Sequence, residues 1–309
     1  MTVITHSVLS ELAARRYVLL LGGSGRLGQE CKAHLRELGI PFWSPMRSEI
    51  DMGNLNGIAK LLATKPPVLI VNAAAFTDVD AAETHRSEAR LINAEVPSTL
   101  AEIASKLDIR LIQISTDFVF SGQEGRAYHE DDEPNPINWY GATKRAGERA
   151  ALMAAPSTIV LRTAWLHGNG RPSFVHAFAR KLANGERVRA IADRFGSPTS
   201  AHALAGQITA ICKAVLDGDD VPGGIYHAAG KGSASPFEIA HVIAGELEAD
   251  VSLIAASSAS ELADIAPRPV YTVLDCQKIE EILGLPCQHW QDGISHTIQH
   301  AGIHGRRVA

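Results

Sequence analysis

Cysteine is scarce in this chain of 309 residues, and its scarcity limits the kinds of site that the chain can hold. The four cysteines, Cys31, Cys212, Cys276 and Cys287, are scattered and form no C-x-x-C pair. Neither a zinc site nor a disulfide framework is therefore indicated, and reduced thiols in a cytosol fit best. We expect most of these side chains to pack in the core.

Long basic blocks and long apolar runs are also missing. The formal net charge is −5 without any basic stretch, which argues against binding to nucleic acid or to an anionic lipid surface. The apolar run YVLLLGG near the amino terminus is shorter than a signal-peptide core or a membrane-spanning helix. We therefore predict a cytoplasmic protein whose partner is a small molecule, with no nucleic acid and no membrane.

Apolar residues make up 46% of the chain, which is enough for a large core. In the first half, short unbroken apolar runs alternate with helical patterns over 25–39, 57–64, 87–106 and 140–154. Such runs suit strands that are buried on both faces of a parallel sheet. This pattern predicts an α/β fold with a doubly wound, Rossmann-like parallel sheet.

Beyond residue 165 the pattern loosens into stretches rich in Gly and Pro, with helices expected near 173–184, 201–216, 236–248 and 292–301. We predict a dinucleotide-binding domain over 1–165, joined by parts of 193–220 and 270–285, and a smaller α+β substrate lobe made mainly of 166–309. Residues 1–16 are either a short amphipathic lead-in or a loosely held tail.

The stretch LLLGGSGRLGQE places three glycines, Gly22, Gly25 and Gly28, between an expected strand and an expected helix. The first glycine permits a tight turn, the second lets a pyrophosphate approach the backbone, and the third lets the helix pack closely on the sheet. The following helix would offer its amino terminus to the phosphates. The β/α context favours dinucleotide binding over a purely steric role for these glycines.

The end of the second strand should contact the ribose of the cofactor. No acid stands at Trp43 or Ser44, and the first charged residue is Arg47, whose guanidinium suits a 2′-phosphate. We therefore expect NADPH, with NADH as an alternative. Asp51 and Met52 are placed to contact the adenine region, while Asp51 could also cap the helix at 54–64.

The third strand ends in small residues, Ala73, Ala74 and Ala75, which would let a flat cofactor lie against the backbone. The alternative is close packing between strand and helix.

A hydroxyl and a Tyr/Lys pair follow the fourth strand. Thr116 stands at the end of IRLIQIST, and Tyr140 and Lys144 are four apart, on one face of an expected helix. An ammonium one turn away would favour the phenolate and lower the pKa of Tyr140, which makes it a usable general acid. Without the dinucleotide turn upstream, Tyr140 would be an ordinary residue at a helix start and Lys144 a solvated neighbour.

These motifs together resemble the extended short-chain dehydrogenase/reductases and, within them, the dTDP-4-dehydrorhamnose reductase family. The resemblance rests on GGSGRLG, NAAAFTDVDAAE, INAEVPSTLA, ISTDFVFSG, YGATKRAGE, RTAWLHG, DRFGSPT and PRPVYTVLD, which span most of residues 18–275. STDFVFSG and NAAAFTDVDAAE are far more specific than the Tyr/Lys pair.

The resemblance implies roles for individual residues. Catalysis would use Thr116, Tyr140 and Lys144, and the sugar would lie near Thr77, Val79, Asp117, Phe118 and Trp165. The cofactor would be held by Gly22, Gly25, Arg26, Leu27, Asp51, Met52, Ala73, Ala74 and Lys144, to which the glycine turn and the second strand add Gly28 and Arg47. Arg268 is our candidate partner for the diphosphate, because its planar fork suits two oxygens. Its alternative role is to fix a loop between two prolines.

Two residues depart from the family pattern: Ala164 stands where Ser is frequent, and His167 stands where Tyr is usual. An altered pocket wall leaves the exact sugar open. His296 and His300 are four apart on an expected helix, but a solvated helix face explains them better than a metal pair, and we predict no metal site.

The reaction implied by the resemblance is hydride transfer from NADPH to C4 of a dTDP-4-keto-6-deoxy sugar, giving dTDP-L-rhamnose for cell-surface polysaccharide. Two alternatives remain: another nucleotide-sugar epimerase or epimerase/reductase, and a non-catalytic regulatory subunit resembling the methionine adenosyltransferase beta subunit. An epimerase would need an additional acid or base, and the sequence indicates no residue for that role. The sequence does not fix the nucleotide base, a need for a divalent ion or the oligomeric state, and a homodimer is one state that it leaves open.

Overall fold

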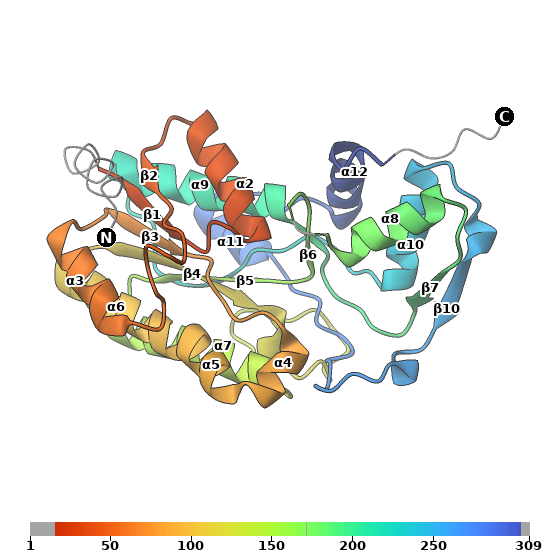
Figure 1. The fold of residues 1–309 in the computed structure, drawn as a ribbon, viewed down its shortest axis with the longest axis horizontal. Coiled ribbons are helices and arrows are strands. Elements are labelled where there is room, and N and C mark those ends of the chain that lie inside the picture. The colour runs from red at the N-terminus through yellow and green to blue at the C-terminus, as the bar shows by residue number, and fades with distance from the viewer. Residues whose placement is uncertain (1–15, 171, 304–309) are drawn as a thin grey trace.

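The computed structural model describes residues 16–170 and 172–303, and its centre is a six-stranded parallel sheet (Figure 1). The strands lie in the order β2-β1-β3-β4-β5-β9. Their bounds are β1 Val18–Leu21, β2 Phe42–Trp43, β3 Leu69–Asn72, β4 Arg110–Thr116, β5 Ile159–Thr163 and β9 Gly224–His227. The strand order reverses between β1 and β3, and this reversal opens a crevice at the carboxyl ends of the strands.

Helices cover both faces of the sheet (Figure 1). One face carries α2 Arg26–Glu37, α9 Ala201–Asp217 and α11 Gln277–Leu283, and the other carries α3 Leu55–Thr64, α6 Val96–Leu107 and α7 Trp139–Ala154. Because successive strand residues point to opposite faces, Val18 and Leu20 pack with α2 and α9, whereas Leu19 and Leu21 pack with α3 and α6. This alternation explains why β1 is apolar at every position.

A smaller lobe has its own apolar core beside the main sheet. It contains α8 Phe174–Ala183, α10 Pro236–Glu246, α12 Trp290–His300 and the parallel strand pair β7 Val188–Ile191 and β10 Ile254–Ser257. A short pair, β6 Leu166–His167 and β8 Thr199–Ser200, lies where the chain passes between the lobes. In Figure 1, α8, α10, β7 and β10 lie at the end of the molecule opposite β1 to β3, and β6 lies between the two ends.

The expected doubly wound parallel sheet is confirmed. The proposed division of the chain stays a prediction, although α9, β9 and α11 come from the second half and pack on the main sheet. The lead-in over 1–16 lies outside the described residues except for its last residue. Among the described residues, no helix combines the length and the apolar character needed to cross a membrane.

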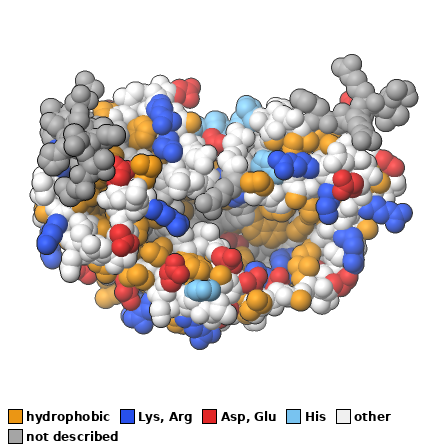
Figure 2. Space-filling view, in the orientation of Figure 1, with side chains coloured by type: hydrophobic (Ala, Val, Ile, Leu, Met, Phe, Trp, Pro, Cys, Tyr) orange, Lys and Arg blue, Asp and Glu red, His pale blue; other side chains and the backbone are white. Residues whose placement is uncertain are grey.

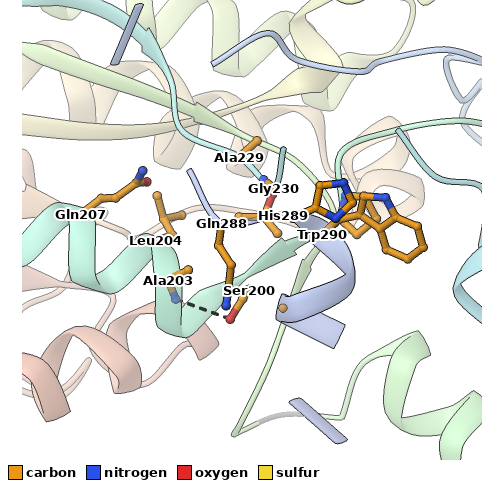
Figure 3. A pocket seen from close by; sticks show the side chains of 12 residues that line it. Ser200, Ala203, Leu204, Gln207, Ala229, Gly230, Gln288, His289 and Trp290 are labelled. Atoms are coloured by element: carbon orange, nitrogen blue, oxygen red, sulfur yellow. Dashed lines mark hydrogen bonds between the residues drawn. The ribbon is translucent and has the colours of Figure 1, made fainter. Parts of the chain in front are cut away.

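A small cavity lies at the joint between the lobes, near Ser200, Ala203, Gly230 and Trp290 (Figure 3). Its volume of about 10 Å³ is at the lower limit for a single water. This cavity is therefore too small to receive a substrate.

Candidate active site

The large pocket, with a volume of about 940 Å³, lies at the carboxyl ends of β1, β3, β4 and β5. The face seen in Figure 2 is hollowed between the two lobes. The residues expected from the sequence that line the pocket are Gly22, Gly25, Arg26, Leu27, Gly28, Arg47, Asp51, Met52, Ala73, Ala74, Ala75, Thr77, Thr116, Asp117, Tyr140, Lys144 and Trp165. Val79, Phe118 and Arg268 do not belong to this lining.

The glycine turn between β1 and α2 leaves room that a side chain would fill. Gly22 has a φ of +80°, and a Cβ there would lie 2.5 Å from the carbonyl carbon of Ala73. A Cβ on Gly28 would lie 2.3 Å from the oxygen of Gly22. The helix begins after Gly25 without a side-chain cap, so its first N–H groups are available to an anion. This cradle fits the pyrophosphate of a dinucleotide.

Arg26 lies in the first turn of α2 and reaches across to the second lobe. Its guanidinium donates to the carbonyl oxygen of Leu166 at 2.8 Å and to that of Pro172 at 3.2 Å. Leu27 packs in the core beneath the turn. Arg26 thus joins the glycine turn to the opposite wall of the pocket.

The segment after β2 forms the rim where the adenosine end of a dinucleotide would lie. Arg47 is exposed there and forms no ion pair with any described residue. The Asp51 carboxylate accepts the backbone N–H of Gly53 at 2.9 Å, while Asn54 caps α3 by accepting the N–H of Gly57. The expected capping role of Asp51 is therefore wrong, because the helix begins three residues later than that role requires.

The segment after β3 carries Ala73, Ala74 and Thr77 along the pocket, and Val79 begins the short helix α4 Val79–Thr84. A residue that sequence reasoning missed, Asn93, fixes this segment. Its side chain exchanges hydrogen bonds with the backbone of Phe76 at 2.9 and 3.0 Å and donates to Thr143 at 3.1 Å. Asn93 lies in the π-helical turn Leu91–Glu95 between α5 Arg86–Arg90 and α6, and only its place in INAEVPSTLA marked it.

The catalytic candidates meet where α7 begins against the end of β4. Asn138 caps α7 by accepting the N–H of Gly141 at 2.8 Å, and a Cβ on Gly141 would lie 2.0 Å from the carbonyl oxygen of Phe118. This close approach brings the side chain of Tyr140 into a hydrogen bond with that of Thr116. Lys144, one turn later, is only 4% exposed.

The electrostatics of this pair differ from the expectation. Burial raises the pKa of Tyr140 from 10.0 to about 12, the hydrogen bond with Thr116 lowers it, and the charge of Asp117 raises it. Burial also lowers the pKa of Lys144 to about 8, against the opposing charge of Glu148. The expected lowering of the Tyr140 pKa is therefore wrong for the chain alone, because burial outweighs the hydrogen bond with Thr116. The Lys144 ammonium donates instead to the carbonyl oxygen of Ile114 at 2.6 Å. Tyr140 is a protonated phenol at neutral pH.

Asp117 lies directly beside Thr116 and is 2% exposed. Its carboxylate is 3.0 Å from the Thr116 hydroxyl and 2.6 Å from the hydroxyl of Thr272. Burial raises the pKa of Asp117 to about 6, while both hydroxyls act in the opposite direction. The site therefore contains a carboxyl group that titrates near neutral pH.

The remaining sugar-pocket candidates have different surroundings. Trp165 has a φ of +43°, which is unusual for a bulky residue, and packs on Gly196 and Phe174. Phe118 meets the Tyr140 ring edge-on, with centroids 5.8 Å apart. Arg268 pairs with Asp80 of α4 at 3.0 Å, so in this structure it fixes the loop in which it lies.

Of the two departures from the family pattern, Ala164 lines the pocket and His167 does not. The buried His167 ring contacts the hydroxyl of Thr297 on α12 at 2.9 Å. Burial lowers its pKa to about 3. His167 therefore joins β6 to α12 as a neutral side chain.

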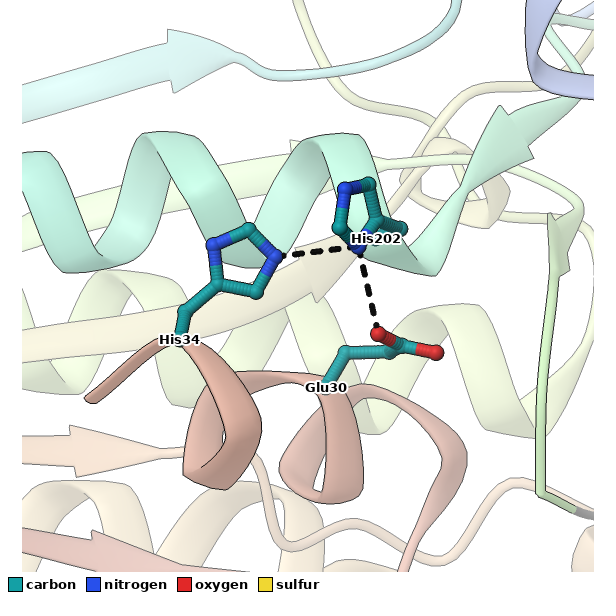
Figure 4. Close-up of side chains that lie close together, drawn as sticks. All are labelled: Glu30, His34 and His202. Atoms are coloured by element: carbon teal, nitrogen blue, oxygen red, sulfur yellow. Dashed lines mark hydrogen bonds and ion pairs between the residues drawn. The ribbon is translucent and has the colours of Figure 1, made fainter. Parts of the chain in front are cut away.

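A second polar cluster lies outside the pocket, between α2 and α9 (Figure 4). His34 Nε2 lies 3.0 Å from His202 Nδ1, which lies 3.4 Å from a carboxylate oxygen of Glu30. The His296 ring stacks on His202 from α12. These contacts join three helices, and the expectation of no metal site stays a prediction.

Comparisons with known proteins agree with this geometry. The family described as RmlD substrate binding domain matches residues 16–303. The chain is 37% identical to the dTDP-4-dehydrorhamnose reductase of Streptomyces griseus, over 90% of this chain and 92% of that one. It is 35% identical to a protein of Streptomyces antibioticus named probable dTDP-4,6-dihydroxy-2-methyloxan-3-one 4-ketoreductase, over 89% and 92% of the two chains.

Among solved structures, the dTDP-4-dehydrorhamnose reductase of Bacillus anthracis in complex with NADP has a TM-score of 0.84 to this chain, at 28% identity. The match covers 93% of this chain and 99% of that one. The family match and the named relatives together span nearly all the described residues. The chain belongs to the RmlD family, the family of the dTDP-4-dehydrorhamnose reductases.

Proposed function

We propose that this chain reduces the C4 keto group of a dTDP-4-keto-6-deoxy sugar with NADPH, giving dTDP-L-rhamnose. The observation that carries the proposal is the meeting, in one pocket, of an uncapped glycine turn with the hydroxyls of Thr116 and Tyr140 and the ammonium of Lys144. Two relatives are named as reductases of dTDP-linked keto sugars, and a solved relative contains NADP. The cofactor and the reaction class follow from this combination.

The cofactor would lie along the carboxyl ends of β1 and β3. Gly22, Gly25 and the first turn of α2 would hold its pyrophosphate, Arg47 its 2′-phosphate, and Lys144 the ribose beside the nicotinamide. When bound, NADPH supplies the hydride for the reduction. Ala73 and Ala74 would leave room for its rings along the strand end.

Thr116 and Tyr140 would bind the keto oxygen of the sugar. As C4 is reduced, this oxygen gains negative charge, and the phenol of Tyr140 donates its proton to it. A raised pKa suits this role, because the phenol keeps its proton until a stronger base, the forming alkoxide, is present. Asp117 and Trp165 line the same pocket and would contact the sugar. Val79 and Phe118, beside that lining, and Arg268 remain candidates for substrate contacts.

The test is an assay of the purified chain with NADPH and dTDP-4-dehydro-6-deoxy-L-mannose, in which loss of NADPH absorbance is followed and the product is identified by NMR. We expect NADPH oxidation and dTDP-L-rhamnose only when both compounds are present. If NADPH binds but no keto sugar, whether dTDP-, UDP- or GDP-linked, is reduced, the regulatory-subunit alternative replaces the reductase. If only a UDP or GDP sugar reacts, the reaction class stands and the named substrate is wrong.

Two further features belong to the same proposal. The enzyme would act in the cytoplasm, where nucleotide sugars and NADPH are available, and a homodimer is the assembly that we would look for first. Light scattering of the purified chain, with and without NADPH, measures that assembly directly.

A further inference from the structure

Four polar side chains form one hydrogen-bonded chain at the catalytic end of the pocket. Thr116 lies between Tyr140 and Asp117, and Asp117 lies between Thr116 and Thr272. Thr116 also accepts the backbone N–H of Phe118 at 3.2 Å. Because Thr116, Asp117 and Thr272 are all buried, each of their protons must be placed either on one of these partners or on a group in the pocket that Thr116 lines.

With Asp117 ionised, the hydrogen bonds are donated toward its carboxylate. A carboxylate only accepts, so Thr116 and Thr272 must both donate to it. A hydroxyl has one proton and two acceptor positions, so Thr116 then accepts from Phe118 N–H and from the phenol of Tyr140. In this state the protons of Thr116 and Tyr140 both point away from a substrate oxygen.

With Asp117 protonated, the direction reverses. Thr272 still donates to Oδ2, so the carboxyl proton lies on Oδ1 and is donated to Thr116. Thr116 then accepts hydrogen bonds from Asp117 and from Phe118 N–H, and its own hydroxyl is free to donate a hydrogen bond to a group in the pocket. The phenol of Tyr140 is also free to donate a hydrogen bond to a substrate, because Thr116 has no acceptor position left for it.

We propose that Asp117 is a positioning residue that sets the direction in which the hydrogen bonds between these four side chains are donated. Its neutral acid is the form that supports reduction. The inference deepens the proposed function and rests on it, since a keto oxygen is the group that the two hydroxyls of Thr116 and Tyr140 would bind as hydrogen-bond donors. It assigns Asp117 a role through Thr116 and Tyr140, in addition to contact with the sugar.

The surroundings of Asp117 place its titration in the working range of an enzyme. The titratable group of α7 that interacts with it is Tyr140, and the Lys144 ammonium, one turn later on α7, is engaged by the carbonyl of Ile114. On the segment that carries Thr272, the guanidinium of Arg268 is paired with Asp80. Among the described residues, no cation pairs with Asp117, and burial raises its pKa to about 6.

The experiment is the pH profile of kcat/KM with NADPH and the keto sugar. In the wild type, kcat/KM should fall as pH rises above about 6, approaching tenfold per pH unit for one required proton. Asp117→Asn should abolish this fall, because the amide N–H donates to Thr116 and the amide oxygen accepts from Thr272 at every pH. A separate change near pH 8 from Lys144 would remain in both proteins.

Two more variants make the test specific. Thr272→Val removes a hydrogen bond that favours the ionised carboxylate, so the fall should move to higher pH. It also serves as the test if Asp117→Asn does not fold. Asp108→Asn, an exposed position at the end of α6, is the control and should keep the wild-type profile. NADPH affinity should be the same in all four proteins.

The outcomes separate this inference from the proposed function. No turnover by the wild type at any pH would remove the proposed function and this inference with it. Turnover without a fall above pH 6, or a fall that persists in Asp117→Asn, would overturn the positioning role of Asp117 while the reductase stands.

Discussion

At the scale of single residues, the proposed preference for NADPH over NADH rests on Arg47. It is exposed at the pocket rim after β2, where we propose that the 2′-phosphate of the cofactor binds. A charge-assisted hydrogen bond contributes about 1.5–3 kcal/mol. Arg47→Ala should therefore raise the Kd for NADPH by about tenfold or more and leave the Kd for NADH nearly unchanged, as measured by fluorescence titration. Arg187→Ala, an exposed arginine of the second lobe, is the control, and an equal loss for both cofactors would refute the 2′-phosphate role.

Asp117 also predicts how stability depends on pH. Its folded pKa of about 6 lies above the usual 3.8, so between these values the folded state binds more protons than the unfolded state. The free energy of unfolding of the wild type should therefore fall, relative to Asp117→Asn, as pH rises from about 4 to about 6. The fall should total about 3 kcal/mol once the carboxyl has titrated fully in both states, from about pH 3 to about pH 7. Urea unfolding of both proteins across this range measures it, and a constant difference would show that the carboxyl is not perturbed.

At the scale of elements, the start of α2 depends on close backbone contact. A Cβ on Gly28 would lie 2.3 Å from the oxygen of Gly22 and 2.6 Å from the Cα of Gly23. Gly28→Ala should therefore push the helix off the turn, cost about 1–3 kcal/mol of stability and abolish NADPH binding. In α10, Gly245→Ala meets nothing within 4 Å and should be neutral or stabilising by up to about 1 kcal/mol. Thermal unfolding and NADPH titration of both variants check this, and equal behaviour would contradict it.

The long helices and central strands could be predicted because their burial leaves a periodic record in the sequence. The helix over 140–154 begins at Trp139, and the run IRLIQIST becomes β4 at 110–116. The strand β9 is not predicted from the sequence, because its four residues follow Val221, Pro222 and Gly223 in a region rich in Gly and Pro. Its place is set by backbone pairing with β5.

The site shows the same division. Candidates at strand ends could be found because parallel strands end at one edge of the sheet, which brings Gly22, Ala73 and Thr116 together. The hydrogen bonds that a side chain forms with residues far away in the sequence could not be predicted from the local sequence. The carbonyl that holds Lys144 and the Thr272 hydroxyl on Asp117 come from segments that no spacing rule connects.

At the scale of the whole molecule, the pocket is formed by residues of both lobes. Contacts that cross it join α2 to Leu166, and Asp117 to Thr272. The proposed chemistry at Thr116 and Tyr140 therefore depends on a segment, residues 266–275, that lies in sequence between β10 and α12 of the second lobe and reaches the site through Thr272. We infer that this assembled pocket directs hydride transfer to the sugar C4 while Tyr140 supplies the proton.

The most direct measurement of that claim uses NADPH that carries deuterium in the transferable hydride, with dTDP-4-dehydro-6-deoxy-L-mannose as substrate. The wild type should place one deuterium on the sugar C4, as seen by NMR and mass spectrometry. Tyr140→Phe should form this product slower by on the order of 10² or more while still binding NADPH. Tyr226→Phe, whose hydroxyl bonds Pro222 away from the pocket, should keep the wild-type rate. Deuterium absent from C4, or near-normal turnover by Tyr140→Phe, would contradict the account.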